Sequence, residues 1–268
     1  MVRGVADRAF LPAKSLLEEV GDMMILTGKT IMSALRPPYP YGGEFVSQFL
    51  FALKLCWFPL VVSTVAFGYG APGLQAANFL VLFGALDRLG GFFVLASIRE
   101  FAPFVTAIVL SGVAGTAITA DLGARKIREE LDALQVLGVD PIKNLVVPRF
   151  LALMVVTGLF NIYALIFGIF GGVLATLTFD APLGPFFATL LNNASIPDLW
   201  GSVLKTTLYG AIIAVVSCYK GMTASGGAEG VGRAVNEAVV IAFMGVFAFN
   251  YVFTQTLLAT HPEVSVIK

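Results

Sequence analysis

The sequence has few charged residues and few of the side chains that enzymes use for covalent chemistry. Only 13% of its 268 residues are charged, whereas 57% are hydrophobic. Its one histidine, His261, lies near the C-terminus, so neither a Ser/His pair nor a histidine metal cluster can be assembled around it. Cys56 and Cys218 both lie in apolar stretches, which predicts small core residues rather than a disulfide framework. The formal net charge is zero, so electrostatics give no support to nucleic acid as a partner.

Long apolar runs dominate what is present. The mean hydropathy is +0.87, far above that of a soluble domain, which predicts a helical protein that crosses a membrane several times. A helix needs about 20 apolar residues to cross a bilayer core of about 30 Å. We therefore predict an all-α membrane protein with five spans: a first that begins at Phe45 and is uncharged over 55–86, then 101–120, a third that begins after Arg149, then 199–219 and 238–258.

The first apolar stretch is longer than one crossing and is interrupted by Pro59, Gly68, Gly70, Pro72 and Gly73. One span with a bent or re-entrant extension fits this pattern better than two full spans. Irregular backbone at membrane depth is tolerated only where it is buried in protein or lines a cavity. The pattern is therefore a mild hint of a substrate pathway.

An amphipathic helix is predicted over residues 13–36. Its apolar stripe includes Leu16, Val20, Met23 and Ile31, and Ser15 with Glu18 matches a capping box. The segment is too polar to span, so we expect it to lie in the cytoplasmic interface of the membrane. An ordinary soluble N-terminal helix is the alternative. Consecutive prolines at 37 and 38 end it.

The most densely charged segment, 121–149, separates two apolar runs and must therefore lie in water at a membrane face. Four of its residues recur on one helical face: Ile127, Leu131, Leu134 and Leu137. Because Gly138 and Pro141 stop a helix, we predict a short amphipathic helix over 125–137. Three base–acid pairs lie four residues apart: Arg125–Glu129, Lys126–Glu130 and Arg128–Asp132. Each has the weaker order, base before acid, so the helix is either a solvated loop helix or a docking element for a cytoplasmic partner.

Small residues predict close helix packing at two places. Four of them repeat at four-residue spacing: Ala107, Ser111, Gly115 and Thr119. The other place is Gly168-x-x-x-Gly172. Packing within the subunit is at least as good an interpretation of the first stripe as a dimer seam. The glycine-rich loop at 220–237 lacks a Gly-Lys-Ser/Thr ending and follows no strand, which argues against a nucleotide site.

The distribution of basic residues predicts the orientation. Twelve Lys and Arg fall in the N-terminal arm and the loops at 121–149 and 220–237, against three, Arg88, Arg99 and Lys268, on the other side. Lys54 and Lys205 lie close to predicted span ends. The positive-inside rule then places the N-terminus in the cytoplasm, and five spans place the C-terminus outside.

Several of these motifs resemble one family. The residues that carry the resemblance are Arg99-Glu100-Phe101-Ala102-Pro103, Gly115-x-x-Ile118-x-Ala120-x-Leu122-Gly123, Glu129-Glu130-Leu131-Asp132-Ala133-Leu134-x-x-Leu137-Gly138-Val139-Asp140-Pro141, Val147-Pro148-Arg149 and Gly221-x-x-Ala224-Ser225-Gly226-Gly227-x-x-Gly230-Val231-Gly232. Over about residues 45–258 the chain resembles the MlaE/YrbE permeases, the membrane subunits of Mla- and Mce-type lipid ABC transporters. The Gly-Gly loop is closer to the Mce-associated YrbE branch.

The resemblance implies one permease domain over 1–268 in a bacterial inner membrane, with an interfacial helix at 13–36 and a five-span core at 45–258. It implies that 125–137 is the coupling helix for an ABC ATPase dimer. The residues at which it places this contact are Arg128, Glu129, Glu130, Asp132, Leu134 and Leu137. It matches Arg99 and Glu100 to a charged pair near an outward lipid pocket. ATP and magnesium would belong to the ATPase, with no cofactor in this chain.

The resemblance also implies a second YrbE-type permease, with a heterodimer favoured over a homodimer, and an MCE-protein assembly on the outer side. Arg99 and Glu100 have a simpler interpretation, a salt bridge at a helix end that faces solvent. Two other function classes stay open: a scaffold that anchors the ATPase without transporting, and an intramembrane enzyme that modifies lipids. The enzyme needs a His, Cys or Asp constellation at one depth, and the sequence suggests none.

Overall fold

The structure is a computed structural model that describes residues 2–262; the side chains of residues 2–13, 15 and 16 are not among those described, and Lys268 lies outside this range. The described chain is helical almost throughout and contains no strand. Its elements are α1 (Val2–Leu35), α2 (Gly42–Gly68), η1 (Tyr69–Gln75), α3 (Ala76–Leu82), η2 (Leu86–Arg88), α4 (Leu89–Phe93), η3 (Val94–Phe101), α5 (Ala102–Leu110), η4 (Ser111–Gly115), α6 (Thr116–Ile127), α7 (Glu130–Val136), η5 (Ile142–Val146), α8 (Val147–Thr178), α9 (Leu183–Asn193), α10 (Ile196–Met222) and α11 (Gly227–Thr260).

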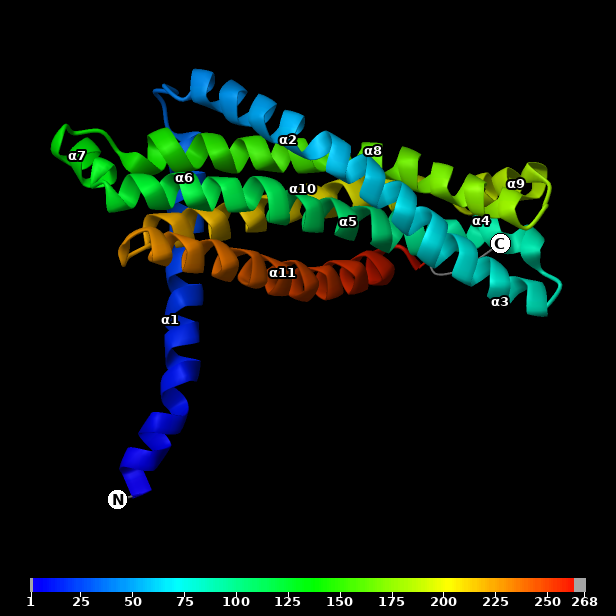
Figure 1. Cartoon of the computed structure of the whole chain (residues 1–268), viewed down its shortest axis with the longest axis horizontal. Helices are drawn as coiled ribbons and strands as arrows, with labels where there is room; N and C mark the ends of the chain where they lie inside the picture. Colours follow the sequence, from blue (N-terminus) through cyan, green and yellow to red (C-terminus); the bar gives the residue numbers. More distant parts are fainter. Residues whose placement is uncertain (1, 263–268) are drawn as a thin grey trace.

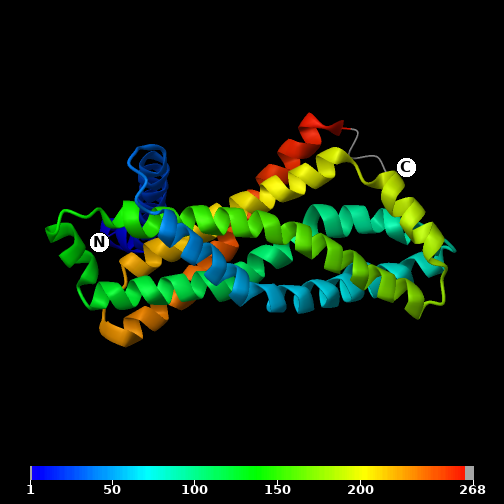
Figure 2. The ribbon, with the colours of Figure 1, turned by 90° about the horizontal axis from the view of Figure 1, so that it is seen from above.

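Five continuous helical segments in the described chain are long and apolar enough to cross a membrane. They are Gly42–Leu82, Leu86–Ile127, Ile142–Thr178, Ile196–Met222 and Gly227–Thr260. They run along one elongated bundle, with α7 at one end and α9 at the other (Figures 1 and 2). The predicted all-α membrane fold with five spans is confirmed.

Most of the spans begin or end well beyond the predicted boundaries. The second starts at Leu86 rather than near residue 101, and the third starts at Ile142 rather than after Arg149. The last two take up most of the loop predicted at 220–237, which leaves only residues 223–226 between them. Charge pairing is part of the physical reason: Arg99, Arg149 and Lys220, which marked loops in the sequence, each pair with an acid on another helix.

The first span is one helix rather than a span with a re-entrant extension. Its π-helical part, η1, contains Pro72 and joins α2 to α3 without a break. The irregularity is buried in protein, because η1 and the end of α2 pack on α8. A methyl group at Gly68 would lie 2.3 Å from the carbonyl oxygen of Gly168, and one at Gly171 would lie 2.6 Å from the backbone nitrogen of Tyr69.

Replacing Gly171 by alanine should therefore destabilise the bundle. The added methyl group meets backbone atoms of Val65, Gly68 and Tyr69 within 3 Å, and overpacking of this kind costs about 1–3 kcal/mol. The expected result is a lower midpoint in a denaturant titration of the detergent-solubilised chain. Gly112→Ala is the matched control, because nothing lies within 4 Å of a methyl group there. Equal midpoints for the two variants would contradict this account of the α2–α8 contact.

The stripe of small residues in the second span faces the interior of the same chain. Ala107, Ser111 and Thr119 are each at most 2% exposed. The hydroxyl of Thr119 donates to the backbone oxygen of Ser217 at 3.1 Å, and a methyl group at Gly115 would lie 2.9 Å from the Ser217 hydroxyl. The stripe therefore packs α5, η4 and α6 against α10, and the dimer-seam alternative is wrong for it.

The N-terminal helix crosses the bundle instead of following it. Figure 1 shows α1 roughly at right angles to the spans, near the end that carries α7. It begins at Val2, so Ser15 lies inside the helix and the predicted capping box is wrong. Met23 and Leu26 are buried against the bundle, whereas Met24 and Leu35 are 70% and 73% exposed. This orientation is the one that the predicted interfacial helix requires.

The segment 121–149 differs most from its prediction. A single helix over 125–137 is wrong, because α6 ends at Ile127 and α7 begins at Glu130. Between them Glu129 has φ of +60°, a left-handed conformation that breaks a helix and is uncommon for residues other than glycine. The break turns α7 so that Leu131 is 4% exposed. Periodicity alone does not reveal such a break, because the apolar spacing continues through it.

A short helix that the sequence analysis did not predict, α9, covers the opposite end of the bundle. It packs on α4 so closely that a methyl group at Gly90 would lie 1.9 Å from the carbonyl oxygen of Phe186. The rings of Phe93 and Phe186 also meet edge to face, with centroids 5.5 Å apart. Residues 180–200 are therefore not a plain loop.

Candidate functional site: a polar network inside the bundle

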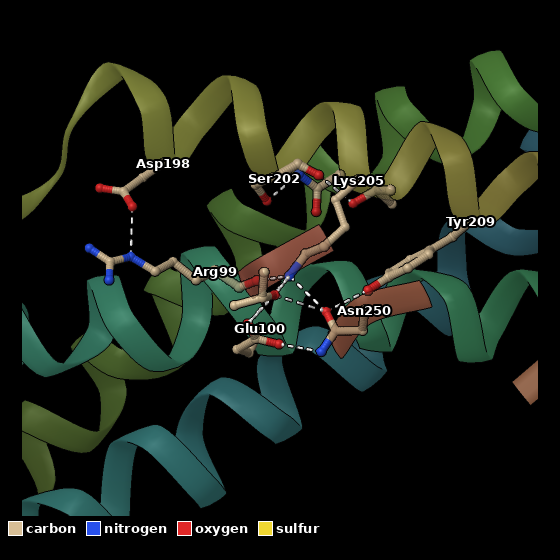
Figure 3. Close-up of polar contacts among 10 residues, drawn as sticks. Arg99, Glu100, Asp198, Ser202, Lys205, Tyr209 and Asn250 are labelled. Carbon is tan, nitrogen blue, oxygen red and sulfur yellow. Dashed lines mark hydrogen bonds and ion pairs between the residues drawn. The ribbon is translucent and has the colours of Figure 1, made fainter. Parts of the chain in front are cut away.

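Arg99 and Glu100 lie in η3, inside the second span and not at its start. Figure 3 shows that the two side chains do not pair with each other but reach different partners on neighbouring helices. The solvent-facing salt bridge at a helix end is therefore wrong as an interpretation. Both residues belong to a polar network that joins η3, α10 and α11.

Arg99 pairs with the first turn of α10. Its Nε donates to Oδ1 of Asp198 at 2.6 Å, and the two side chains are 14% and 0% exposed. The other Asp198 oxygen accepts the Ser195 hydroxyl at 2.6 Å, and the two residues form the capping box that begins α10. One buried carboxylate thus starts a helix and holds the guanidinium.

Lys205 is the centre of the network. Its side chain is 4% exposed, and its ammonium lies 3.4 Å from Oε1 of Glu100. It also donates to the backbone oxygen of Arg99 at 2.5 Å and to Oδ1 of Asn250 at 2.9 Å. An ammonium group has three donors, so these contacts, with a further one to Thr254 at 3.3 Å, satisfy it fully.

Glu100 and Asn250 close the network on the α11 side. Oε2 of Glu100 accepts from Nδ2 of Asn250 at 2.9 Å, and Oε1 accepts the Thr254 hydroxyl at 3.1 Å. The Tyr209 hydroxyl donates to Oδ1 of Asn250 at 2.7 Å. Every helix that contributes to the network is thereby tied to the other two.

Two cations and two anions make the network neutral. That balance matters at membrane depth, where an unpaired charge is costly. The space between Arg99, Glu100, Asp198 and Lys205 is about 10 Å³, room for no more than one water. In this arrangement the space enclosed by the network is too small for a lipid head group, and Asp198 holds Nε of Arg99.

The sequence analysis missed five members of this network. They are Asp198, Lys205, Tyr209, Asn250 and Thr254. Lys205 was placed close to the end of a predicted span. For four of the five, though not for Asp198, the signal was a polar or ionisable side chain inside a predicted apolar span, since such residues face the bundle interior and pair with one another.

An apolar groove lies on another face of α10 and α11. It has a volume of about 580 Å³, within the range of small-molecule sites. Five of the side chains that line it are Met23 and Met24 of α1, Ile212 and Val215 of α10, and Met244 of α11. Apart from Glu19 and Thr27 its lining side chains are apolar, so the groove suits an alkyl chain.

The residues predicted to contact an ATPase lie together on and beside α7, at one end of the bundle. Arg128 pairs with Glu130 at 2.8 Å and Lys126 with Asp132 at 3.1 Å, so none of the predicted i,i+4 pairs forms. Glu129 is exposed. The helix break is the reason, because it removes the regular spacing on which those pairs depend.

The apolar residues of α7 point in different directions. Leu131 is buried and Leu134 is half-buried against the bundle, whereas Val136 and Leu137 are 88% and 76% exposed. Exposed apolar side chains at the tip of a charged segment are typical of interaction sites. Leu137 is therefore separated from the face that it was predicted to share with Leu131.

An ion pair closes the base of this charged segment. Nη2 of Arg149 lies 2.6 Å from Oδ2 of Asp121, and the arginine side chain is 1% exposed. Asp121 also pairs with Arg125 at 3.1 Å. The contact holds α6 against α8.

No group of three or more His, Cys, Asp or Glu that could hold a metal ion occurs among the described residues. Both cysteines are free and buried. His261 lies in the described part of the chain and contacts Thr260 and the Trp200 ring.

Comparison with known proteins assigns the family. The family described as Permease MlaE matches residues 45–256. A probable ABC transporter permease protein of Synechocystis is 36% identical over 184 residues, 66% of this chain and 68% of that protein. One of Rickettsia typhi is 30% identical over 243 residues, 90% and 92% of the two chains. The protein TRIGALACTOSYLDIACYLGLYCEROL 1 of Arabidopsis thaliana, chloroplastic, is 34% identical over 186 residues, 68% of this chain and 52% of that one. With five spans, a central polar network and this match, the chain belongs to the MlaE family of ABC transporter permeases.

Proposed function

We propose that this chain is the permease subunit of an ATP-driven lipid transporter of the Mla/Mce type. The observation that carries the proposal is the second span, Leu86–Ile127, which runs from the buried network at Arg99 and Glu100 to the exposed tip that carries α7. One continuous helical segment thus connects the proposed docking site of the ATPase with the charge pairs of the network.

The coupling step begins at α7. A partner ATPase, which holds the ATP and magnesium, docks on the exposed side chains around Glu129, Asp132 and Leu137. Closure of the ATPase dimer moves α7, and the clamp between Asp121 and Arg149 passes that movement to α6 and α8. The bundle then shifts between two arrangements.

The lipid step uses Arg99 and the apolar surfaces of the bundle. In the closed arrangement Asp198 neutralises Arg99. In the open arrangement an anionic lipid head group replaces Asp198, because guanidinium binds carboxylate or phosphate bidentately. The apolar groove between α1, α10 and α11, which is large enough for an alkyl chain, supports this step. The name of the Arabidopsis relative refers to a diacylglycerol glycolipid, which supports a lipid as the cargo class.

The assembly has further members. A second YrbE-type permease pairs with this one, a heterodimer being favoured, and an MCE-protein assembly receives or delivers lipid on the outer side. The end that carries α7 faces the cytoplasm of a bacterial inner membrane, with the N-terminus. Arg99 lies inside the bundle and no longer counts among the outer basic residues, which sharpens the charge asymmetry behind that orientation.

Two alternatives make different predictions. A scaffold that only anchors the ATPase does not need Arg99 and tolerates its replacement by glutamine without loss of lipid movement. An intramembrane enzyme turns lipid into product without any ATPase. The MlaE family match and the permease relatives favour the transporter over both.

Mild-detergent co-purification of the tagged chain, with mass spectrometry of bound proteins and lipids, tests the proposal directly. We expect an ABC ATPase, a second permease, MCE proteins and a lipid. If the chain is recovered without an ATPase, under conditions that keep other ABC transporters intact, the result would favour the scaffold or the enzyme over the transporter.

Charge reversal at Glu129 and Glu130 tests the coupling step. The double variant Glu129→Lys/Glu130→Lys should abolish lipid-stimulated ATPase activity of the reconstituted complex, because like charges replace the acidic contacts and the Arg128–Glu130 pair is lost. Membrane insertion should be unchanged. Glu18→Lys is a control, since Glu18 is an exposed acid on α1, away from α7. Full lipid-stimulated activity in the double variant would refute the coupling role.

A further inference from the structure

A basic pocket lies where α1 meets the start of η5. It has a volume of about 330 Å³, and its charged lining residues are Lys29 and Arg36 from α1 and Asp140 and Lys143 from the stretch after α7. Three cations and one anion leave a positive balance. The pocket is separate from the network around Arg99 and from the apolar groove.

None of the three cations that line this pocket forms an ion pair with a described acidic side chain. Among the cations whose side chains the structure describes, those without an ion pair are Lys29, Arg36, Lys54, Arg88 and Lys143. Three of these five line this one pocket. Asp140, although it lines the same pocket, accepts the backbone N–H of Ile142 at 2.9 Å. Lys143 donates one N–H to the backbone oxygen of Arg36 at 3.2 Å, which leaves two for a ligand.

The pocket lies at the depth of lipid head groups if the five spans cross the membrane. Figure 1 shows α1 across the end of the bundle, so the whole helix lies close to one membrane surface. Its exposed apolar residues, such as Met24 and Leu35 at 70% and 73% exposure, need a lipid environment. Met32, 53% exposed, lines the pocket itself. A phosphate among the cations would therefore have its alkyl chains beside Met32.

We propose that this pocket binds the phosphate of an anionic membrane lipid. The bound lipid would join α1 to the start of η5, which follows α7 in the chain. The proposal needs only that the spans cross a membrane, and it stands or falls independently of transport. An acidic protein segment fits less well, because the pocket shares α1 with side chains that must face lipid. The lipid would bridge Lys29 and Arg36 of α1 to Lys143, and so brace the segment that carries α7.

Native mass spectrometry of the full chain in detergent measures the binding. The chain is titrated with dioleoyl phosphatidylglycerol or dioleoyl phosphatidylcholine, and retained lipid is counted. Because one basic residue near a membrane surface contributes about 1 kcal/mol, or about fivefold in affinity, we expect at least a tenfold preference for phosphatidylglycerol. The variant Lys29→Gln/Arg36→Gln/Lys143→Gln should lose that preference. Lys29→Arg/Lys143→Arg should keep it.

A matched control uses the two remaining unpaired cations. Lys54→Gln/Arg88→Gln removes charges of the same kind outside the pocket, and it should retain the full preference. Three results would overturn the proposal: no preference in the wild-type chain, an equal loss in the control, or displacement of phosphatidylglycerol by excess inorganic phosphate, which would indicate a soluble anion. Loss of a co-purified ATPase from the triple-glutamine variant, with lipid retention unchanged, would indicate an acidic protein surface instead.

Discussion

Replacing Lys205 by methionine should lower the free energy of unfolding by about 3 kcal/mol, the low end of the range for breaking a buried ion pair. The lower end applies because the Glu100 side chain is 32% exposed, whereas that of Lys205 is 4% exposed. Loss of the ammonium leaves the carboxylate of Glu100 without its cation and removes the hydrogen bond from Lys205 to the backbone oxygen of Arg99. A denaturant titration of the chain in detergent micelles measures the change.

A second substitution separates the charge pair from simple packing. Adding Glu100→Gln to Lys205→Met removes the uncompensated charge, and the double variant should recover a large part of the lost stability, giving a coupling energy in the double-mutant cycle. Lys54→Met is the matched control, because Lys54 is exposed in α2 and has no ion pair with a described residue. Additive losses, or an equal loss for Lys54→Met, would show that the network does not act as a unit.

Leu137→Asp should weaken binding of the ATPase by at least about 2 kcal/mol, or about 30-fold, the loss typical of an interface hot spot. Leu137 is 76% exposed, so the substitution should leave the stability of the isolated chain unchanged. An affinity measurement between the reconstituted permease and the purified ATPase gives the result.

Leu131→Asp is the informative contrast, since Leu131 lies one residue into α7 but is 4% exposed. A carboxylate at this buried position would be shielded from water, so this variant should have a lower free energy of unfolding than the wild-type chain, whether or not the ATPase is present. Unchanged ATPase affinity in Leu137→Asp, measured on folded protein, would mean that the ATPase docks elsewhere than at the exposed tip of α7.

Local physics explains which parts of the fold were predictable. A bilayer core imposes a minimum apolar length on any crossing helix, so the number of spans was readable from uncharged runs such as 101–120 and 150–179. The motifs around Glu129 and Gly226 carried the family resemblance without any coordinates. These features depend on residue type and on near neighbours in the chain.

The extent of the spans and the composition of the network did not depend on near neighbours. Arg99 and Arg149 marked loop boundaries in the sequence, yet both lie inside helices, because Asp198 and Asp121 neutralise them from other parts of the chain. A charge ends a span only if it lacks a partner, and partners 99 residues away, as Asp198 is from Arg99, leave no periodic signal.

By itself the sequence determined five membrane crossings, an all-helical architecture, a charged segment at one membrane face and the MlaE family. Only the tertiary structure decided that Lys205 binds Glu100 and Asn250, that Glu129 breaks the helix before α7, and that Lys29 and Lys143 meet in one pocket. The reason is physical: hydrophobic length acts along the chain, whereas charge neutralisation acts across space between helices.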